Sequence, residues 1–171
     1  MNITDIKNGL QSIIQTQSGV TTIFANQNAP VPDKPFITLL LTTTNKLGHD
    51  VSSQTSDTQE TVTGQRELDV SIQAFGDTSY QILLDLQDSF ESVGIRESLA
   101  AFGLVYVSNE AVTNADETLE TTIEHRALMS VLFRTDSTKI YNNGIIEQVD
   151  TTHTIYNPDG SVADNQNYLI G

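Results

Sequence analysis

Two hydrophobic periodicities meet across a short turn within residues 64–93. In residues 66–75 apolar and polar side chains alternate, which is typical of a strand that buries one face, and the apolar positions are Leu68, Val70, Ile72 and Ala74. Gly76 and Asp77 end the alternation, and Asp77 or Thr78 can cap a helix. Apolar residues then recur at spacings of three and four, at Tyr80, Leu83, Leu86, Phe90 and Val93. The pattern predicts a strand followed by an amphipathic helix that lies on the apolar face of a sheet.

The N-terminal residues predict a second amphipathic helix and a short strand. Thr4 can cap a helix over residues 5–17, and Gly19 can end it. The apolar stripe of this helix consists of Ile6, Leu10, Ile13 and Ile14. Residues 20–24 are a strand candidate.

A rigid connection then leads into a strand and a long polar stretch. The prolines of residues 29–35 fix an extended link, and residues 36–44 carry apolar side chains on both faces, which indicates a strand in the middle of its sheet. In residues 45–64 the apolar side chains are Leu47, Val51 and Val62. This stretch is either an unstructured loop or a projecting β-hairpin arm. The arm is favoured because unstructured loops of this length are uncommon in compact domains.

The second half of the domain repeats the mixture of helix and strand. Residues 95–102 predict a short helix or turn that ends at Gly103, and residues 104–107 predict a strand. A polar, acidic loop follows at residues 110–118. Residues 122–134 then predict a long strand with apolar residues on both faces, which we expect to be central and covered on both sides. One face of this strand consists of Ile123, Ala127, Met129, Val131 and Phe133.

The last residues predict short strands joined by tight turns. Asn142-Asn143-Gly144 is a strong hairpin signal, and Asn157-Pro158-Asp159-Gly160 is a second turn. The resulting β-meander has too few apolar residues for a core of its own, namely Ile140, Tyr141, Ile145, Ile146, Ile155 and Tyr156. The meander must therefore pack against something else.

Together these elements predict an α+β fold. We expect a mostly antiparallel central sheet with helices packed on one face, a projecting β-hairpin arm at residues 45–64 and a C-terminal β-meander. The chain of 171 residues would divide into a domain of residues 1–136 and a β extension of residues 137–171.

Composition narrows the functional classes. With 22 acidic and 8 basic side chains the formal net charge is −14, which argues against a protein that grips nucleic acid through Lys and Arg. An acidic surface is compatible with basic partners, or with DNA sliding past without binding. The chain has no cysteine, so thiolate chemistry is excluded. It also lacks a stretch apolar enough to span a membrane, and its first residues carry no export signal, so we expect a soluble protein.

The sequence predicts no catalytic, cofactor-binding or metal-ligating residue. The histidines are scattered without a second ligand at metal spacing; His125 falls at an apolar position of its strand and is interpreted as a core or interface histidine, while His49 and His153 are interpreted as solvated. Asp85, Asp88 and Glu91 are interpreted as a solvated helix face, since nothing near them suggests a cleft that would separate their pKa values.

The order of elements carries a resemblance to a known family. After the first helix, Val31-Pro32-Asp33-Lys34-Pro35-Phe36 enters a strand that is followed by the polar arm. The strand Leu68-Asp69-Val70-Ser71-Ile72-Gln73-Ala74-Phe75-Gly76, a helix over residues 80–90 and a final long strand complete the order. Over residues 3–135 this order resembles the tail-terminator or neck proteins of tailed bacteriophages, small α+β subunits that form a hexameric ring on the tail tube. Residues 136–171 depart from the family's pattern.

The resemblance implies a structural virion protein of the phage neck, assembled in the host cytoplasm. Its ring would end the tail tube and join the tail to the head-completion complex. The implied partners are other copies of the chain in a homo-hexamer, the tail tube protein, the head-completion or connector proteins and the tail sheath. DNA would pass through the ring without specific binding, and neither a membrane, a cofactor nor an enzymatic activity is implied.

Apolar residues in polar surroundings are the candidates for subunit contacts. They are Leu47, Val51, Val62, Ile145, Ile146, Tyr156, Tyr168, Leu169 and Ile170. Alternative interpretations stay open: another head-completion or baseplate component, a non-viral protein-binding module that remains monomeric, or an enzyme, which would show a deep polar pocket.

Overall fold

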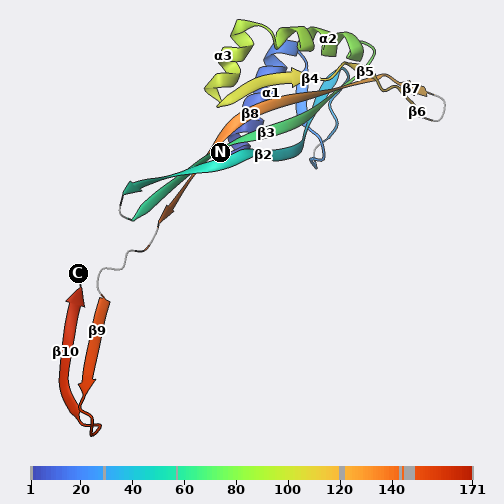
Figure 1. Cartoon of the computed structure of the whole chain (residues 1–171). Coiled ribbons are helices and arrows are strands. Elements are labelled where there is room, and N and C mark those ends of the chain that lie inside the picture. Colours follow the sequence, from blue (N-terminus) through green and yellow to red (C-terminus); the bar gives the residue numbers. More distant parts are fainter. Residues whose placement is uncertain are drawn as a thin grey trace. The chain divides into compact units, whose positions relative to one another are not determined.

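In the residues that it describes, the computed structural model of the chain has three helices on the same side of a β-sheet (Figure 1). It describes residues 2–28, 30–56, 58–119, 122–142, 144 and 149–170. The chain forms two compact units, a first unit of Met1–Val51 and Thr63–Lys139 and a second unit of Ser52–Val62 and Ile140–Gly171.

In the described residues, one helix is followed by three strands and two helices, and the elements after these are strands. The helices are α1 Ile3–Ser18, α2 Ser79–Ser89 and α3 Val93–Ala101. The strands are β1 Thr21–Phe24, β2 Phe36–Ser56, β3 Gln59–Phe75, β4 Leu104–Asn109, β5 Thr113–Asn114, β6 Glu117–Leu119, β7 Thr122–Glu124, β8 Arg126–Asn142, β9 Val149–Tyr156 and β10 Val162–Ile170.

The large sheet is mixed, with strand order β1-β2-β3-β8-β4 and β5 paired to β8. β4 and β5 pair antiparallel with β8, but β1 pairs parallel with β2, where Thr21 lies opposite Phe36. The expectation of a mostly antiparallel sheet was therefore wrong. The connection at residues 25–35 is long enough to carry the chain back to the end of the sheet where β1 began, which a tight turn cannot do.

The first helix follows from its apolar stripe and its two ends. Ile6, Leu10, Ile13 and Ile14 are all buried, as the spacing predicted. The helix begins earlier than expected, because Asn2 and not Thr4 is the cap: the Asn2 Oδ1 accepts from the Thr4 backbone N–H at 3.1 Å. Gly19 ends it in the left-handed region at φ 69, donating its N–H to the Gln15 carbonyl.

The apolar stripe predicted from Tyr80 to Val93 spans parts of two helices in the structure, and the second of them is the short helix or turn predicted at residues 95–102. α2 ends at Ser89, and α3 begins at Val93 with the Ser92 hydroxyl accepting from the Ile95 backbone N–H at 3.3 Å. The bend takes Val93 out of the buried stripe, and Val93 is 71% and Tyr80 46% exposed. A cap inside an otherwise continuous apolar pattern therefore divided the helix.

The predicted long strand at residues 122–134 is interrupted at His125, between β7 and β8. Ile123 is 62% exposed and His125 is exposed. Neither residue belongs to the core, contrary to the expectation for Ile123 and to the core interpretation of His125. β8 then runs on to Asn142, through the predicted domain boundary at residue 136.

Among the described residues, the helices cover one face of the sheet (Figure 1). The β8 residues that face the helices are fully buried, namely Ala127, Met129, Val131 and Phe133. Leu40, Leu128 and Leu132 on the other face are half-buried, which corrects the expectation of cover on both sides. The reason is that all three helices pack on one side of the sheet (Figure 1). We call the other side the open face.

An aromatic cluster lies on the covered face, where the end of α2 meets β8 and the edge strand β4. The Phe90 ring stacks on Tyr106 at a centroid distance of 5.3 Å and meets Phe133 edge-on at 5.9 Å. Phe90 and Phe133 are fully buried. α2 and its neighbour β4 are thus held to β8 by rings that are distant in the sequence.

The polar stretch at residues 45–64 lies almost wholly in β2 and β3, which are neighbours in the sheet. In its second-unit part, the Thr55 and Thr61 hydroxyls are 2.7 Å apart and the Ser52 hydroxyl donates to Glu60. Paired strand, and not an unstructured loop, is therefore what these residues form, apart from Asp57, which lies outside the described residues.

The C-terminal residues form a separate two-stranded antiparallel sheet of β9 and β10, with Val162 opposite Tyr156. The predicted turn at Asn157 to Gly160 is confirmed: Gly160 has φ 83 and donates its N–H to the Asn157 carbonyl at 2.9 Å. The predicted Asn142-Asn143-Gly144 hairpin falls partly outside the described residues, because Asn143 is not among them. Residues 145–148 lie wholly outside them.

Candidate assembly surfaces

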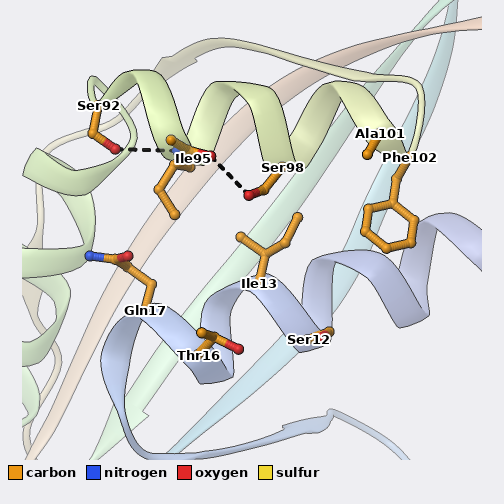
Figure 2. A pocket seen from close by; sticks show the side chains of 10 residues that line it. Ser12, Ile13, Thr16, Gln17, Ser92, Ile95, Ser98, Ala101 and Phe102 are labelled. Atoms are coloured by element: carbon orange, nitrogen blue, oxygen red, sulfur yellow. Dashed lines mark hydrogen bonds between the residues drawn. The ribbon is translucent and has the colours of Figure 1, made fainter.

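An open groove of about 510 Å³ runs between α1 and α3 in the first unit (Figure 2). Figure 2 shows Ile13 and Ile95 pointing toward each other from the two helices, with Phe102 lying over α1 at one end. The remaining lining is small and neutral, mainly Ser, Thr, Gly and Ala, and none of the described lining residues is charged. A groove without a titratable group offers no acid or base, so it suits packing and not chemistry.

Several titratable side chains elsewhere in the described residues form ion pairs. Within the described residues, no group of three or more His, Cys, Asp or Glu side chains is placed to hold a metal ion. The exposed His125 lies beside Asp116, with Nδ1 3.2 Å from the carboxylate. The pKa of Asp116 is lowered chiefly because its carboxylate accepts the Arg126 backbone N–H at 2.9 Å. The pair thus holds the loop before β8 in place.

An ion pair joins β2 to β3 where the polar stretch begins. Arg66 donates two hydrogen bonds to the Asp50 carboxylate, at 2.8 and 2.9 Å, and Lys46 lies 3.1 Å from the same group. Each side chain of the Arg66–Asp50 pair is 17% exposed. The hydrogen bond from Arg66 is the main reason that the pKa of Asp50 is lowered to about 2, with Lys46 adding to the effect.

Gly64 makes room for this ion pair. A Cβ at Gly64 would lie 1.7 Å from the Asp50 Oδ1 and 2.9 Å from an Arg66 guanidinium nitrogen. The position therefore excludes any side chain as long as the pair is formed. Three residues of β2 and β3 are thus matched to each other in register and in size.

The second unit has no buried side chain among its described residues. In the hairpin of β9 and β10, Ile155, Tyr156 and Val162 are 58%, 64% and 57% exposed. Isolated two-stranded sheets are marginal in water, and none of the side chains described for this one is buried. It is a surface that another protein can cover.

The predicted contact residues are divided between the two units. Leu47 is half-buried and Val51 is 70% exposed in the first unit. Val62 is half-buried in the second unit, where Tyr156 is exposed, and Tyr168, Leu169 and Ile170 fall on β10. Ile145 and Ile146 lie outside the described residues.

Sequence reasoning missed one exposed apolar position at the edge of the large sheet. Val105 is 61% exposed on β4, the last strand in the order. The signal was available, because alternation along residues 104–107 places Val105 opposite the buried Leu104. The alternation along residues 104–107 does not show, however, that this strand lies at the edge of the sheet.

A comparison with known protein families decides what kind of protein this is. Residues 4–161 match the family described as phage neck terminator protein. The chain belongs to this family. No curated protein matches it.

As a neck terminator, the chain is a structural protein of the bacteriophage neck, located in the tail region of the virion, and it interacts with other tail or head proteins. The match extends further than the resemblance over residues 3–135 suggested. It includes β9 and its turn, so residues 136–161 are part of the family's pattern and were wrongly set apart; only β10 lies beyond the match.

The terminator's helices are not membrane segments. None of the helices in the described ranges is both long and apolar enough to cross a bilayer. The groove and the exposed hairpin are candidate surfaces for protein contacts.

We expect Gly64→Ala to destabilise the terminator. The new methyl group would displace the Asp50 carboxylate from Arg66, and overpacking of this kind costs about 1–3 kcal/mol. Chemical denaturation at neutral pH measures the loss. Gly94→Ala is the matched control, because a Cβ there meets nothing within 4 Å and Ala favours helix α3.

The loss should also depend on pH. A carboxyl whose pKa is lower in the folded state stabilises the fold above its unfolded value of about 3.9, and this contribution disappears as the pH falls toward about 2. The difference between wild type and Gly64→Ala should therefore narrow between these values. A difference that stays constant over this range would show that the ion pair is not what the substitution breaks.

Proposed function

We propose that the chain forms a homo-hexameric ring that ends the tail tube and joins the tail to the head-completion complex. The ring contacts the tail tube protein below, the connector proteins above and, in a contractile tail, the sheath. DNA passes through it without specific binding. The role is structural and not enzymatic.

The observation that carries the proposal is the amount of surface left without a partner in a neck terminator. The open face has half-buried leucines, and the second unit has exposed apolar residues without a core. Single exposed apolar residues are ordinary, but strands without a core require another protein. Assembly into a closed ring covers the open face by symmetry, and contacts with other neck proteins cover the second unit.

Polar side chains of neighbouring strands also form hydrogen bonds with each other on the open face. Arg134 donates to Glu67 at 2.8 Å, and the Ser130 hydroxyl donates to Asp69 at 3.3 Å. Such contacts tolerate water, so this face can be partly solvated in the ring. The mixture of leucines and paired charges is typical of an assembly interface and not of a core.

The charge supports passage of DNA. Six copies of a chain with net charge −14 carry −84, and a lumen with this sign repels the phosphate backbone. Repulsion keeps the DNA from adhering while it moves. A DNA-gripping ring would need the opposite charge.

The second candidate is a different head-completion or baseplate component. The length and exposure of the second unit are compatible with either position, since both require contacts with neighbouring proteins. The order of proteins in the assembled particle distinguishes them: a terminator lies between tail tube and connector. Immunogold labelling of particles would place it.

The test of the ring is the mass of the purified protein. We expect a species of six times 18.7 kDa, about 112 kDa, by light scattering, and closed rings in negative stain. Because ring proteins can require a template, the measurement is repeated with purified tails that lack this protein. A chain that stays at 18.7 kDa in both conditions contradicts the proposal.

A further inference from the structure

The second unit differs from the first in its charge as well as in its lack of a core. Residues 52–62 and 140–171 contain six acidic residues and no Lys or Arg; the acidic residues are Asp57, Glu60, Glu147, Asp150, Asp159 and Asp164. Every basic side chain of the protein therefore belongs to the first unit. A surface of one sign favours a partner of the opposite sign.

The apolar part of this surface lies on strands with free edges. Val162 and Tyr156 are cross-strand partners, and both are exposed. Ile155 follows the opposite side of β9 and is exposed as well. In the described part of the chain, β9 and β10 pair with each other and with no third strand, so an edge is open to another chain.

A second copy of this chain is a poor partner for such a surface, because its basic side chains are already engaged. Asp50 holds Lys46 and Arg66; the other ion pairs are Lys34–Glu124, Arg96–Glu91, Arg126–Glu117 and Arg134–Glu67. Lys7 lies over the Phe24 ring at 5.8 Å. Among the described residues Lys139 alone has no such partner, and the first unit still has twice as many acidic as basic residues.

We propose that the second unit docks on a different protein of the virion, one that presents Lys and Arg around an apolar surface. Ile155 and Tyr156 at the end of β9 and Val162 at the start of β10 supply the apolar contact, and the acidic residues orient the approach. The strands β9 and β10, which lack a core, then become ordered when they bind the partner. The partner either pairs a strand of its own with the hairpin or covers one face of it. This inference rests on the proposed function in one respect, that the partner is a neighbouring protein in the phage neck. It does not require that the chain forms a ring.

The test uses full-length protein and two probes, tails and heads, each purified from phage that lack this protein. Asp150→Lys with Asp164→Lys reverses two charges of the second unit, and Asp85→Lys with Asp88→Lys reverses two exposed charges of α2 as the matched control. Cosedimentation measures binding. We expect the wild type and the α2 variant to bind one of the probes, and the second-unit variant to bind at least tenfold more weakly.

Two further measurements keep the outcome interpretable. Far-UV circular dichroism reports whether the second-unit variant is folded; if it is not, Asp150→Asn with Asp164→Asn replaces it, with a smaller but still measurable weakening expected. Binding of the wild type should also weaken as salt rises from about 0.05 to 0.5 M, since exposed charges are screened.

Three results would overturn the inference. Unchanged binding of the second-unit variant shows that its charge is not used. If the second-unit variant no longer forms the oligomer, a second copy of the chain is the partner. If the second-unit variant, measured without a partner, has a lower melting temperature than the wild type, the hairpin docks on the first unit of its own chain. A wild type that binds the probe but remains monomeric would contradict the ring and leave this inference standing.

Discussion

Replacing Phe133 by Ala is expected to cost about 3–5 kcal/mol of the free energy of unfolding. Phe133 is fully buried and lies edge-on to Phe90 at 5.9 Å and to Tyr106 at 6.4 Å. Removing its ring leaves a cavity between α2, β4 and β8, and the rigid sheet cannot collapse into it. Since domains are stable by about 5–15 kcal/mol, the variant should be largely destabilised or unfolded at 37 °C.

Denaturation by urea measures this loss, and Tyr141→Ala serves as the control. Tyr141 is 47% exposed in the second unit, so its removal should change the free energy of unfolding by less than about 0.5 kcal/mol. Equal losses for the two substitutions would mean that the aromatic cluster is not part of the core. A loss of the expected size would also explain why assembly variants must be chosen outside the covered face.

The second large effect is expected from a chain that ends at Lys139. This end follows the first unit and keeps Thr135 and Ser137, which are buried on β8. A deletion from residue 136 would remove part of a core strand and confuse folding with assembly. The shortened chain should keep the helical far-UV signature and a cooperative unfolding transition, because every buried side chain of the described residues lies in the first unit.

The shortened chain should nevertheless fail to complete infectious particles. Each large apolar side chain that the hairpin buries on a partner contributes about 1.5–3 kcal/mol before the cost of ordering, and Ile155, Tyr156 and Val162 are all lost. Complementation of a phage that lacks the protein measures the defect as plaque formation. If the shortened chain completes particles as well as the full chain, residues 140–171 have no role in assembly.

The sequence determined most of the local structure. The stripe of α1, the alternation along β3 and the turn at Asn157 to Gly160 were predicted because each depends on residues within a few positions of one another. The family resemblance also came from the order of such elements, and the family match confirmed it. The acidic charge, and a C-terminal segment with too few apolar residues for a core of its own, were likewise properties of composition.

Tertiary structure decided which surfaces are covered. Apolar residues on both faces of β8 gave no indication that all three helices lie on one side, which leaves Leu128 and Leu132 half-buried. The parallel pairing of β1 with β2 depends on where a long connection returns, and the pattern of prolines does not encode this direction. Ile123 and His125 are exposed because the strand is interrupted at His125, and the apolar periodicity of residues 122–134 did not predict this interruption.

The site at the base of the polar stretch shows the same division most clearly. Asp50, Gly64 and Arg66 are ordinary residues of a polar segment when read along the chain. The register of β2 and β3 brings together side chains 16 positions apart, so that the ion pair occupies the space that Gly64 leaves. Periodicity specifies which face of a strand a residue lies on, but only the pairing of strands specifies which charge it meets, because that contact is set by long-range register and not by local sequence.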